Sequence, residues 1–181
     1  GVRFRLPASM NQVEYFGRGP AENYLDRNAG SMIGLYKSTA EELYFPYVRP
    51  QENGHHTDTR WVSLSTGKKG LLIQADNTIG FNALRNSIED FDDEEATGLP
   101  RQWSNFTPEQ VANHDEAAAK SVLRRQHHIN DITPRDFVEV CVDLKQQGVA
   151  GYDSWGSRPE PAYTLPANRE YNWGFTLIPL K

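Results

Sequence analysis

An alternating run between residues 137 and 144 constrains the fold of this chain more than any other stretch. Every second position is apolar, at Val138, Val140, Val142 and Leu144. Neighbouring side chains of a strand point to opposite faces, so a period of two predicts a β-strand with one apolar face. The positions between them are mostly polar, so a single face of this strand is expected to pack into a core.

Shorter runs of the same kind occur along most of the chain, between turns rich in glycine and proline. Strands are expected at residues 1–7, 13–16, 32–36, 59–65, 71–75, 81–84 and 171–177. A turn at Asp76-Asn77-Thr78 is expected to separate two of them. Many short strands joined by such turns predict an all-β fold, an antiparallel β-sandwich or barrel.

One short helix is expected against this β background. Thr107 is a suitable N-cap, Pro108 would occupy the first helical position, and Gln110 stands three residues after the cap. The run Ala117-Ala118-Ala119-Lys120 that follows is a good helix former.

Composition excludes several classes of function. A length of 181 residues suffices for one domain with a core. The net charge of −5 argues against a nucleic-acid partner, because binding phosphates requires clustered lysine and arginine. No apolar run is long enough to cross a bilayer. The single Cys141 excludes an internal disulfide and does not distinguish cytoplasm from periplasm. The chain opens without methionine or leader, so we expect it to be part of a longer polypeptide.

Metal and cofactor sites are not expected. The pairs His55-His56 and His127-His128 are adjacent in sequence, and neighbouring residues of a strand face opposite ways. A zinc site would also need three or four converging ligands. The sequence contains no nucleophile elbow and no glycine-rich phosphate loop.

Carboxylates are the remaining catalytic option, since glycoside hydrolysis uses a pair of them. Seven are available: Glu14, Glu22, Asp26, Glu52, Asp58, Asp143 and Asp153. Glu52 and Asn53 stand in a stiff, proline-containing loop, and Arg60 follows soon after. The favoured interpretation is a salt bridge that braces the loop, and a contact of these three residues with substrate ranks second.

The stretch from Gly148 to Gly156 carries a tryptophan among small and polar residues. That context predicts that Trp155 lies in a loop at a sheet end, where binding residues tend to occur. Its indole would offer a flat apolar face to the C–H face of a sugar ring. The alternative is a tryptophan that plugs the end of a β-sandwich.

Three segments together resemble one family. They are residues 17–27 (GRGPAENYLDR), residues 47–54 (YVRPQENG, with Thr59-Arg60 after it) and residues 148–155 (GVAGYDSW). They resemble, in the same order, segments of the large bacterial β-galactosidases of glycoside hydrolase family 2. The resemblance covers nearly the whole chain and is to the C-terminal part of their last domain, the small-chain domain.

The resemblance implies a single domain, residues 1–181, with a β-sandwich of the galactose-mutarotase-like, supersandwich type. The stretch from about residue 92 to 125 would be an insertion that holds the short helix. The family's two catalytic glutamates lie in a separate TIM barrel, so no residue of this chain is expected to be catalytic. Mg and Na ions of such enzymes are bound elsewhere. Missing partner strands would leave sheet edges that could pair between copies, giving a homo-oligomer.

The resemblance also implies a role for Trp155, which would stack on a galactoside at the mouth of the active site. Asp153 and Ser154 would hold its loop, and the TIM barrel of the same chain would be the neighbouring domain. Ala150 and Tyr152 depart from the family pattern, where glycine and aspartate are usual. Alanine resists some torsions that glycine adopts, so the conformation of the loop is less defined.

Two other functions are consistent with the sequence. The chain could be an independent carbohydrate-binding module, which would require affinity for sugar in isolation. It could also be a mutarotase-like epimerase, for which His55, His56 or Glu52 would supply the acid and the base.

Overall fold

The computed structural model describes residues 1–48, 50–91, 129, 132–153 and 155–181. Two compact units are distinguished. One consists of Gly1–Phe45, Asn53–Asn86 and Pro134–Lys181, and we call it the sheet unit because it contains all seven described strands. The other consists of Pro46–Glu52 and Ser87–Thr133. The expectation of a single domain over residues 1–181 stays a prediction.

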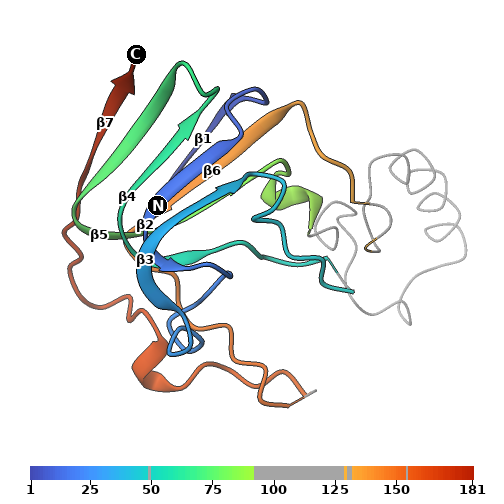
Figure 1. The fold of residues 1–181 in the computed structure, drawn as a ribbon. Coiled ribbons are helices and arrows are strands. Elements are labelled where there is room, and N and C mark those ends of the chain that lie inside the picture. The colour runs from blue at the N-terminus through green and yellow to red at the C-terminus, as the bar shows by residue number, and fades with distance from the viewer. Residues whose placement is uncertain (49, 92–128, 130–131, 154) are drawn as a thin grey trace, which may run out of the picture. The chain divides into compact units, whose positions relative to one another are not determined.

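The strands of the sheet unit form one antiparallel sheet (Figure 1). They are β1 (Val2–Pro7), β2 (Gln12–Gly19), β3 (Met32–Thr39), β4 (His56–Ser65), β5 (Gly70–Leu84), β6 (Phe137–Asp143) and β7 (Phe175–Leu180). Their order is β1-β6-β5-β4-β2-β3, with β7 also beside β5. The all-β, antiparallel class is therefore confirmed, and the sheet is consistent with a β-sandwich.

Two short 3-10 turns are described in full, η1 (Ile88–Asp90) and η5 (Pro161–Tyr163). The expected helix after Thr107, and most of the expected insertion, lie outside the described residues. Within the part of the chain that the structure describes, no helix is long and apolar enough to cross a membrane.

The prediction of two strands separated by a turn at residues 76–78 is wrong, because β5 continues through this stretch. Trp61 of β4 pairs with Gln74, whereas Thr59 pairs with Ile79, so five steps along β5 match two along β4. The extra residues form a bulge, which bends the strand without reversing it. Figure 1 shows β5 changing direction along its length. The turn-like composition of the triplet therefore marks a bulge.

The last strand begins later than the alternation of residues 171–177 predicts. β7 starts at Phe175, which pairs with Ala75, and the bulge of β5 begins just beyond that point. The regular edge of β5 that β7 pairs with ends at this point, so Tyr171 and Trp173 are not paired with β5. Pro179 is tolerated because β7 is an edge strand.

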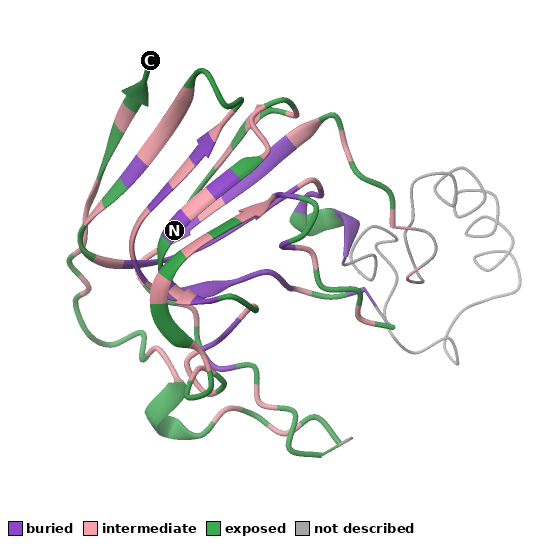
Figure 2. Cartoon of the chain, viewed as in Figure 1, coloured by how far each residue is buried: buried purple, intermediate pink, exposed green. Residues whose placement is uncertain are grey.

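The core lies on one face of the bent sheet. Val138, Val140 and Val142 of β6 are fully buried, which confirms three of the four residues of the predicted apolar face. The fourth, Leu144, follows the end of the strand and is half-buried. The rings of Tyr15 in β2 and Phe81 in β5 lie 5.2 Å apart, so the inner faces of two parts of the sheet contact each other. Burial of each such side chain contributes about 1.5–3 kcal/mol. Figure 2 shows the buried residues concentrated along these strands.

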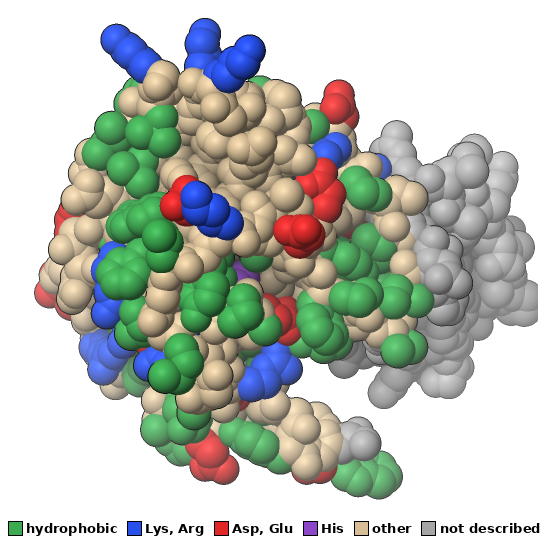
Figure 3. Space-filling view, in the orientation of Figure 1, with side chains coloured by type: hydrophobic (Ala, Val, Ile, Leu, Met, Phe, Trp, Pro, Cys, Tyr) green, Lys and Arg blue, Asp and Glu red, His purple; other side chains and the backbone are tan. Residues whose placement is uncertain are grey.

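The edge strand β3 exposes apolar side chains. Met32 is 70% and Leu35 59% exposed, and Figure 3 shows hydrophobic side chains on the face of the molecule that carries β3. An open edge of this kind can pair with another strand. Association between copies through a sheet edge stays a prediction.

Candidate functional site

Three parts of the sheet unit meet at one place. Residues 20–27, which we call the anchor segment, follow β2. They contact residues 53–57, which we call the β4 entry, and residues 148–157, which we call the Trp155 loop. Each part overlaps one of the three sequence segments described above, so the fold brings these segments together.

Glu22 links the anchor segment to the β4 entry. Its Oε2 accepts a hydrogen bond from the Gly54 N–H at 2.6 Å, and its Oε1 accepts one from Arg27 Nη2 at 2.9 Å. The Glu22 side chain is only 6% exposed, so its carboxylate is largely shielded from water, whereas the Arg27 side chain is 50% exposed. Gly54 has a φ of +76°, and an added Cβ would lie 2.9 Å from Leu84 Cδ2, so glycine is required.

Asn23 makes a second link between the same two parts. Its N–H donates to the His55 carbonyl at 2.7 Å. Its Oδ1 accepts from the N–H of Thr57 at 3.0 Å and from the Thr57 hydroxyl at 2.6 Å. Its Nδ2 donates to the carbonyls of Arg18 and Ala21. The side chain thus uses both its donor and its acceptor to fix the anchor segment.

Asp26 links the anchor segment to the Trp155 loop. Its Oδ1 accepts from the Val149 N–H at 3.1 Å, and its Oδ2 accepts from the Ala150 N–H at 2.8 Å. The Gly148 N–H donates to the Tyr163 carbonyl at 2.8 Å. An added Cβ at Gly148 would lie 2.5 Å from Asp26 Oδ2, so the close approach of loop and carboxylate requires glycine.

The Trp155 loop is also held from within. Asp153 Oδ1 accepts from the N–H groups of Trp155 at 2.8 Å and Ser157 at 3.4 Å, and Ser157 Oγ accepts from the Tyr152 N–H at 3.1 Å. Trp155 is 94% exposed, so it does not plug the end of the sheet. Figure 2 colours most of this loop as exposed. Ser154 lies outside the described residues, and the substrate-binding role of all three candidates stays a prediction.

The lower-ranked candidates lie in different surroundings. Asn53 is buried, its Oδ1 accepts from the Phe45 N–H at 3.0 Å, and its carbonyl accepts from Asn82 Nδ2 at 2.6 Å. Arg60 donates to the Asp58 carbonyl at 2.5 Å and lies on the outer face of the sheet. Glu52 belongs to the second compact unit. A substrate contact by any of the three stays a prediction.

The two histidines of the β4 entry are structural. Both are fully buried. His55 Nδ1 lies 2.9 Å from Asn82 Oδ1, and His56 Nδ1 lies 2.9 Å from the Gly54 carbonyl. Burial lowers the pKa of His55 to about 4 and also lowers the pKa of His56. A sugar in solution cannot reach either ring, which removes both as acid or base for an epimerase.

Metal ligands do not gather in the described residues. No three His, Cys, Asp or Glu side chains of this part of the chain lie close enough together to hold an ion. The carboxylates of the site serve as acceptors for backbone N–H groups instead.

Sequence reasoning did not identify the three anchoring side chains by their role. The sequence places Glu22, Asn23 and Asp26 in one motif, and offers Glu22 and Asp26 as available carboxylates, but it assigns none of the three an anchoring role. The signal was present in composition, because Asp, Glu and Asn crowd one short loop and these side chains readily accept backbone N–H groups.

Comparisons with known proteins agree with the family resemblance of the sequence. A family model described as the β-galactosidase small chain matches residues 1–177. The β-galactosidase of Priestia megaterium is 34% identical over 181 residues, which is 99% of this chain and 14% of that protein. That of Vibrio cholerae is 28% identical over 98% of this chain, and that of Arthrobacter sp. strain B7 is 40% identical over 50% of it. The chain spans about 14% of the length of its first two curated relatives.

Proposed function

Because the chain belongs to the β-galactosidase small-chain family, we propose that it shapes the substrate entrance of a β-galactosidase. The matched relatives are about seven times longer than the match, so other domains of the same chain are implied. In this proposal a TIM barrel of that chain hydrolyses terminal β-galactosides, and the present region is not catalytic. Trp155 stacks on the sugar or its leaving group.

The observation that carries the proposal is an exposed indole on an anchored loop. A stacking residue must be accessible, and Trp155 is 94% exposed. It must also be held in place, because ordering a free loop upon binding would reduce affinity. Asp26 fixes the start of the loop and Asp153 fixes the backbone at the tryptophan.

The side chains at the end of the Trp155 loop are suited to binding a sugar. The indole offers an apolar face for the C–H groups of a pyranose and one N–H donor at its edge. Asp153 uses Oδ1 to hold the loop. Stacking contributes binding and orientation, so its loss is expected to weaken affinity more than it slows the chemical step.

A chimeric enzyme tests the proposal. This chain would replace the matching region of the Priestia megaterium β-galactosidase, and kcat and KM for lactose would be measured. Trp155→Ala is expected to raise KM severalfold or more with a smaller change in kcat, and Trp155→Phe to retain part of the affinity. Leu35→Ala, which removes another exposed side chain, serves as the control. An unchanged KM in Trp155→Ala would rule out the stacking role.

A further inference from the structure

A groove of about 480 Å³ crosses the outer face of the sheet, opposite the core. Val62 and Ile73 are fully buried on the inner face. Their neighbours Trp61 and Gln74, which pair with each other across β4 and β5, line the groove. Its volume falls within the range of about 300–1,000 Å³ that is typical of small-molecule sites.

The bulge between β4 and β5 places an unusual set of side chains in this groove. Arg60 and Trp61 are consecutive and would face opposite ways in a regular strand, yet both line it. The pairing of β4 with β5 shifts register between Thr59 and Trp61, and such irregularities redirect side chains. Asn77 belongs to the bulged stretch of β5 and reaches the same groove. Bulges often occur beside functional sites.

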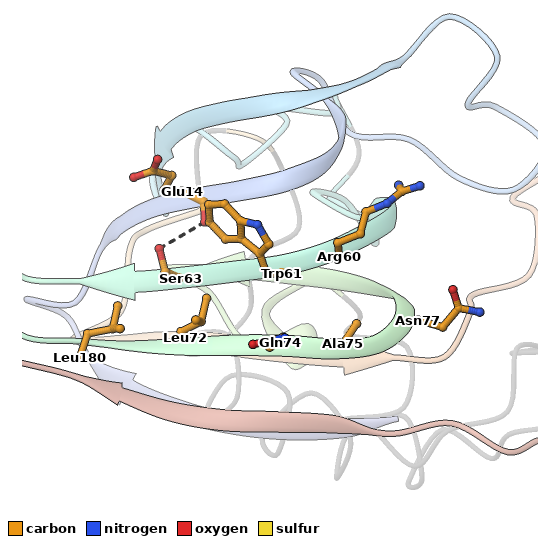
Figure 4. Close-up of a pocket in the computed structure, with 9 residues that line it drawn as sticks. All are labelled: Glu14, Arg60, Trp61, Ser63, Leu72, Gln74, Ala75, Asn77 and Leu180. Carbon is orange, nitrogen blue, oxygen red and sulfur yellow. Dashed lines mark hydrogen bonds between the residues drawn. The ribbon is translucent and has the colours of Figure 1, made fainter.

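Figure 4 shows how the lining is arranged. Trp61 lies in the middle, between Glu14 of β2 and Gln74 of β5. Arg60 and Asn77 lie toward one end, whereas leucines line the other. The groove therefore combines one large aromatic side chain with polar groups on three strands.

The polar groups suit a neutral ligand with many hydroxyl groups. Glu14 supplies acceptors, Arg60 supplies donors, and the amides of Gln74 and Asn77 supply both. The lining carries one carboxylate and one guanidinium, and Lys37 Nζ lies 3.5 Å from that carboxylate. This is not the cluster of unpaired cations that binding phosphate or nucleic acid requires. An indole beside such groups can cover the apolar face of a pyranose while they bind its hydroxyls.

From this geometry we propose that the groove is a second saccharide site, separate from Trp155. Its ligand class is a neutral mono- or disaccharide that lies across Trp61. Its hydroxyls donate to Glu14, accept from Arg60, and do both with the amides of Gln74 and Asn77. The inference does not depend on the role of the Trp155 loop, since the two share no residue. It gives the isolated chain an affinity for sugar that an entrance wall alone would lack.

Isothermal titration calorimetry of the 181-residue chain with galactose, lactose and cellobiose tests the site. At least one sugar is expected to bind with a millimolar dissociation constant. Trp61→Ala should weaken binding at least about tenfold, equivalent to about 1.4 kcal/mol. Gln74→Ala should weaken it severalfold and, because Gln74 is exposed, should leave the fold intact. Trp155→Ala removes an indole elsewhere and should change affinity less than twofold.

Two results would overturn the inference. One is no heat of binding from any of the three sugars at tens of millimolar. The other is binding that Gln74→Ala leaves unchanged, or that Trp155→Ala weakens as much as Trp61→Ala does. Circular dichroism identifies a misfolded Trp61→Ala protein, in which case Gln74→Ala decides. Either failure leaves the KM test of Trp155 in the chimeric enzyme unaffected.

Discussion

The β4 entry and the Trp155 loop are held by the same anchor segment but differ in burial. Residues 53–57 are all buried, whereas Val149, Tyr152 and Trp155 are exposed. Both depend on a carboxylate that accepts backbone N–H groups, Glu22 in one case and Asp26 in the other. A buried bond of this kind contributes to global stability, whereas an exposed one chiefly fixes a local conformation. The comparison shows that the β4 entry is a buried structural element, whereas the Trp155 loop is an exposed segment held in a defined position.

Gly54→Ala is expected to have the largest effect on stability, because it strains the backbone of the buried β4 entry. An alanine at φ +76° is unfavourable, and its Cβ would lie 3.0 Å from the Leu43 carbonyl oxygen. We expect the free energy of unfolding to fall by about 3 kcal/mol, measured by urea denaturation. Gly30→Ala is the matched control, since no atom lies within 4 Å of its added Cβ. Equal stability of the two variants would contradict the distinction.

Lowering the pH should reduce the stability that the buried β4 entry contributes to the fold. Burial lowers the pKa of His55 from 6.5 to about 4, so the unfolded chain binds the proton first as pH falls. The free energy of unfolding should therefore decrease between pH 6.5 and 4, by up to about 1.4 kcal/mol per pH unit from this group. Urea titrations at several pH values measure it. His55→Gln should flatten the slope, and an equally steep slope in that variant would assign it to other groups.

Asp26→Ala tests the anchoring of the exposed Trp155 loop and should have a smaller, local effect. The variant removes the acceptors of the Val149 and Ala150 N–H groups. Amide hydrogen exchange at these two residues should accelerate severalfold, while global stability falls by only about 1 kcal/mol. Exchange at Thr57 in the β4 entry serves as the internal control. Unchanged exchange at Val149 and Ala150 would show that Asp26 does not hold the loop.

Ala150→Gly should have the smallest effect and the opposite sign. Ala150 has a φ of +56°, a conformation that glycine adopts without steric cost. The gain in the folded state is partly offset by the greater freedom of glycine when unfolded, so stabilisation of at most about 1 kcal/mol is expected. A thermal melt measures it. Destabilisation by this substitution would contradict the left-handed conformation.

Local sequence patterns predicted those features of the fold that depend only on residues close together in the sequence. The apolar face of β6 follows from alternation alone, and the polar neighbours of Trp155 indicated an exposed loop. The bulge in β5 could not be predicted, because Asp76-Asn77-Thr78 is equally typical of a turn, and only pairing with β4 distinguishes the two. The anchoring roles of Glu22 and Asp26 depend on partners 32 and more than 120 residues away. Such contacts leave no periodic signal in one sequence.

The two halves of β5 have different partners on one edge, β7 along residues 70–75 and β6 along residues 80–84. The segment that joins β6 to β7 carries Trp155, so both ends of this segment are fixed to a single strand. Its length can therefore change over evolution without shifting the register of any strand. Doubling the length of a flexible loop raises the entropic cost of closing it by only about 0.6 kcal/mol. Lineages could thus adjust how far the indole of Trp155 reaches from the sheet while the scaffold stays the same.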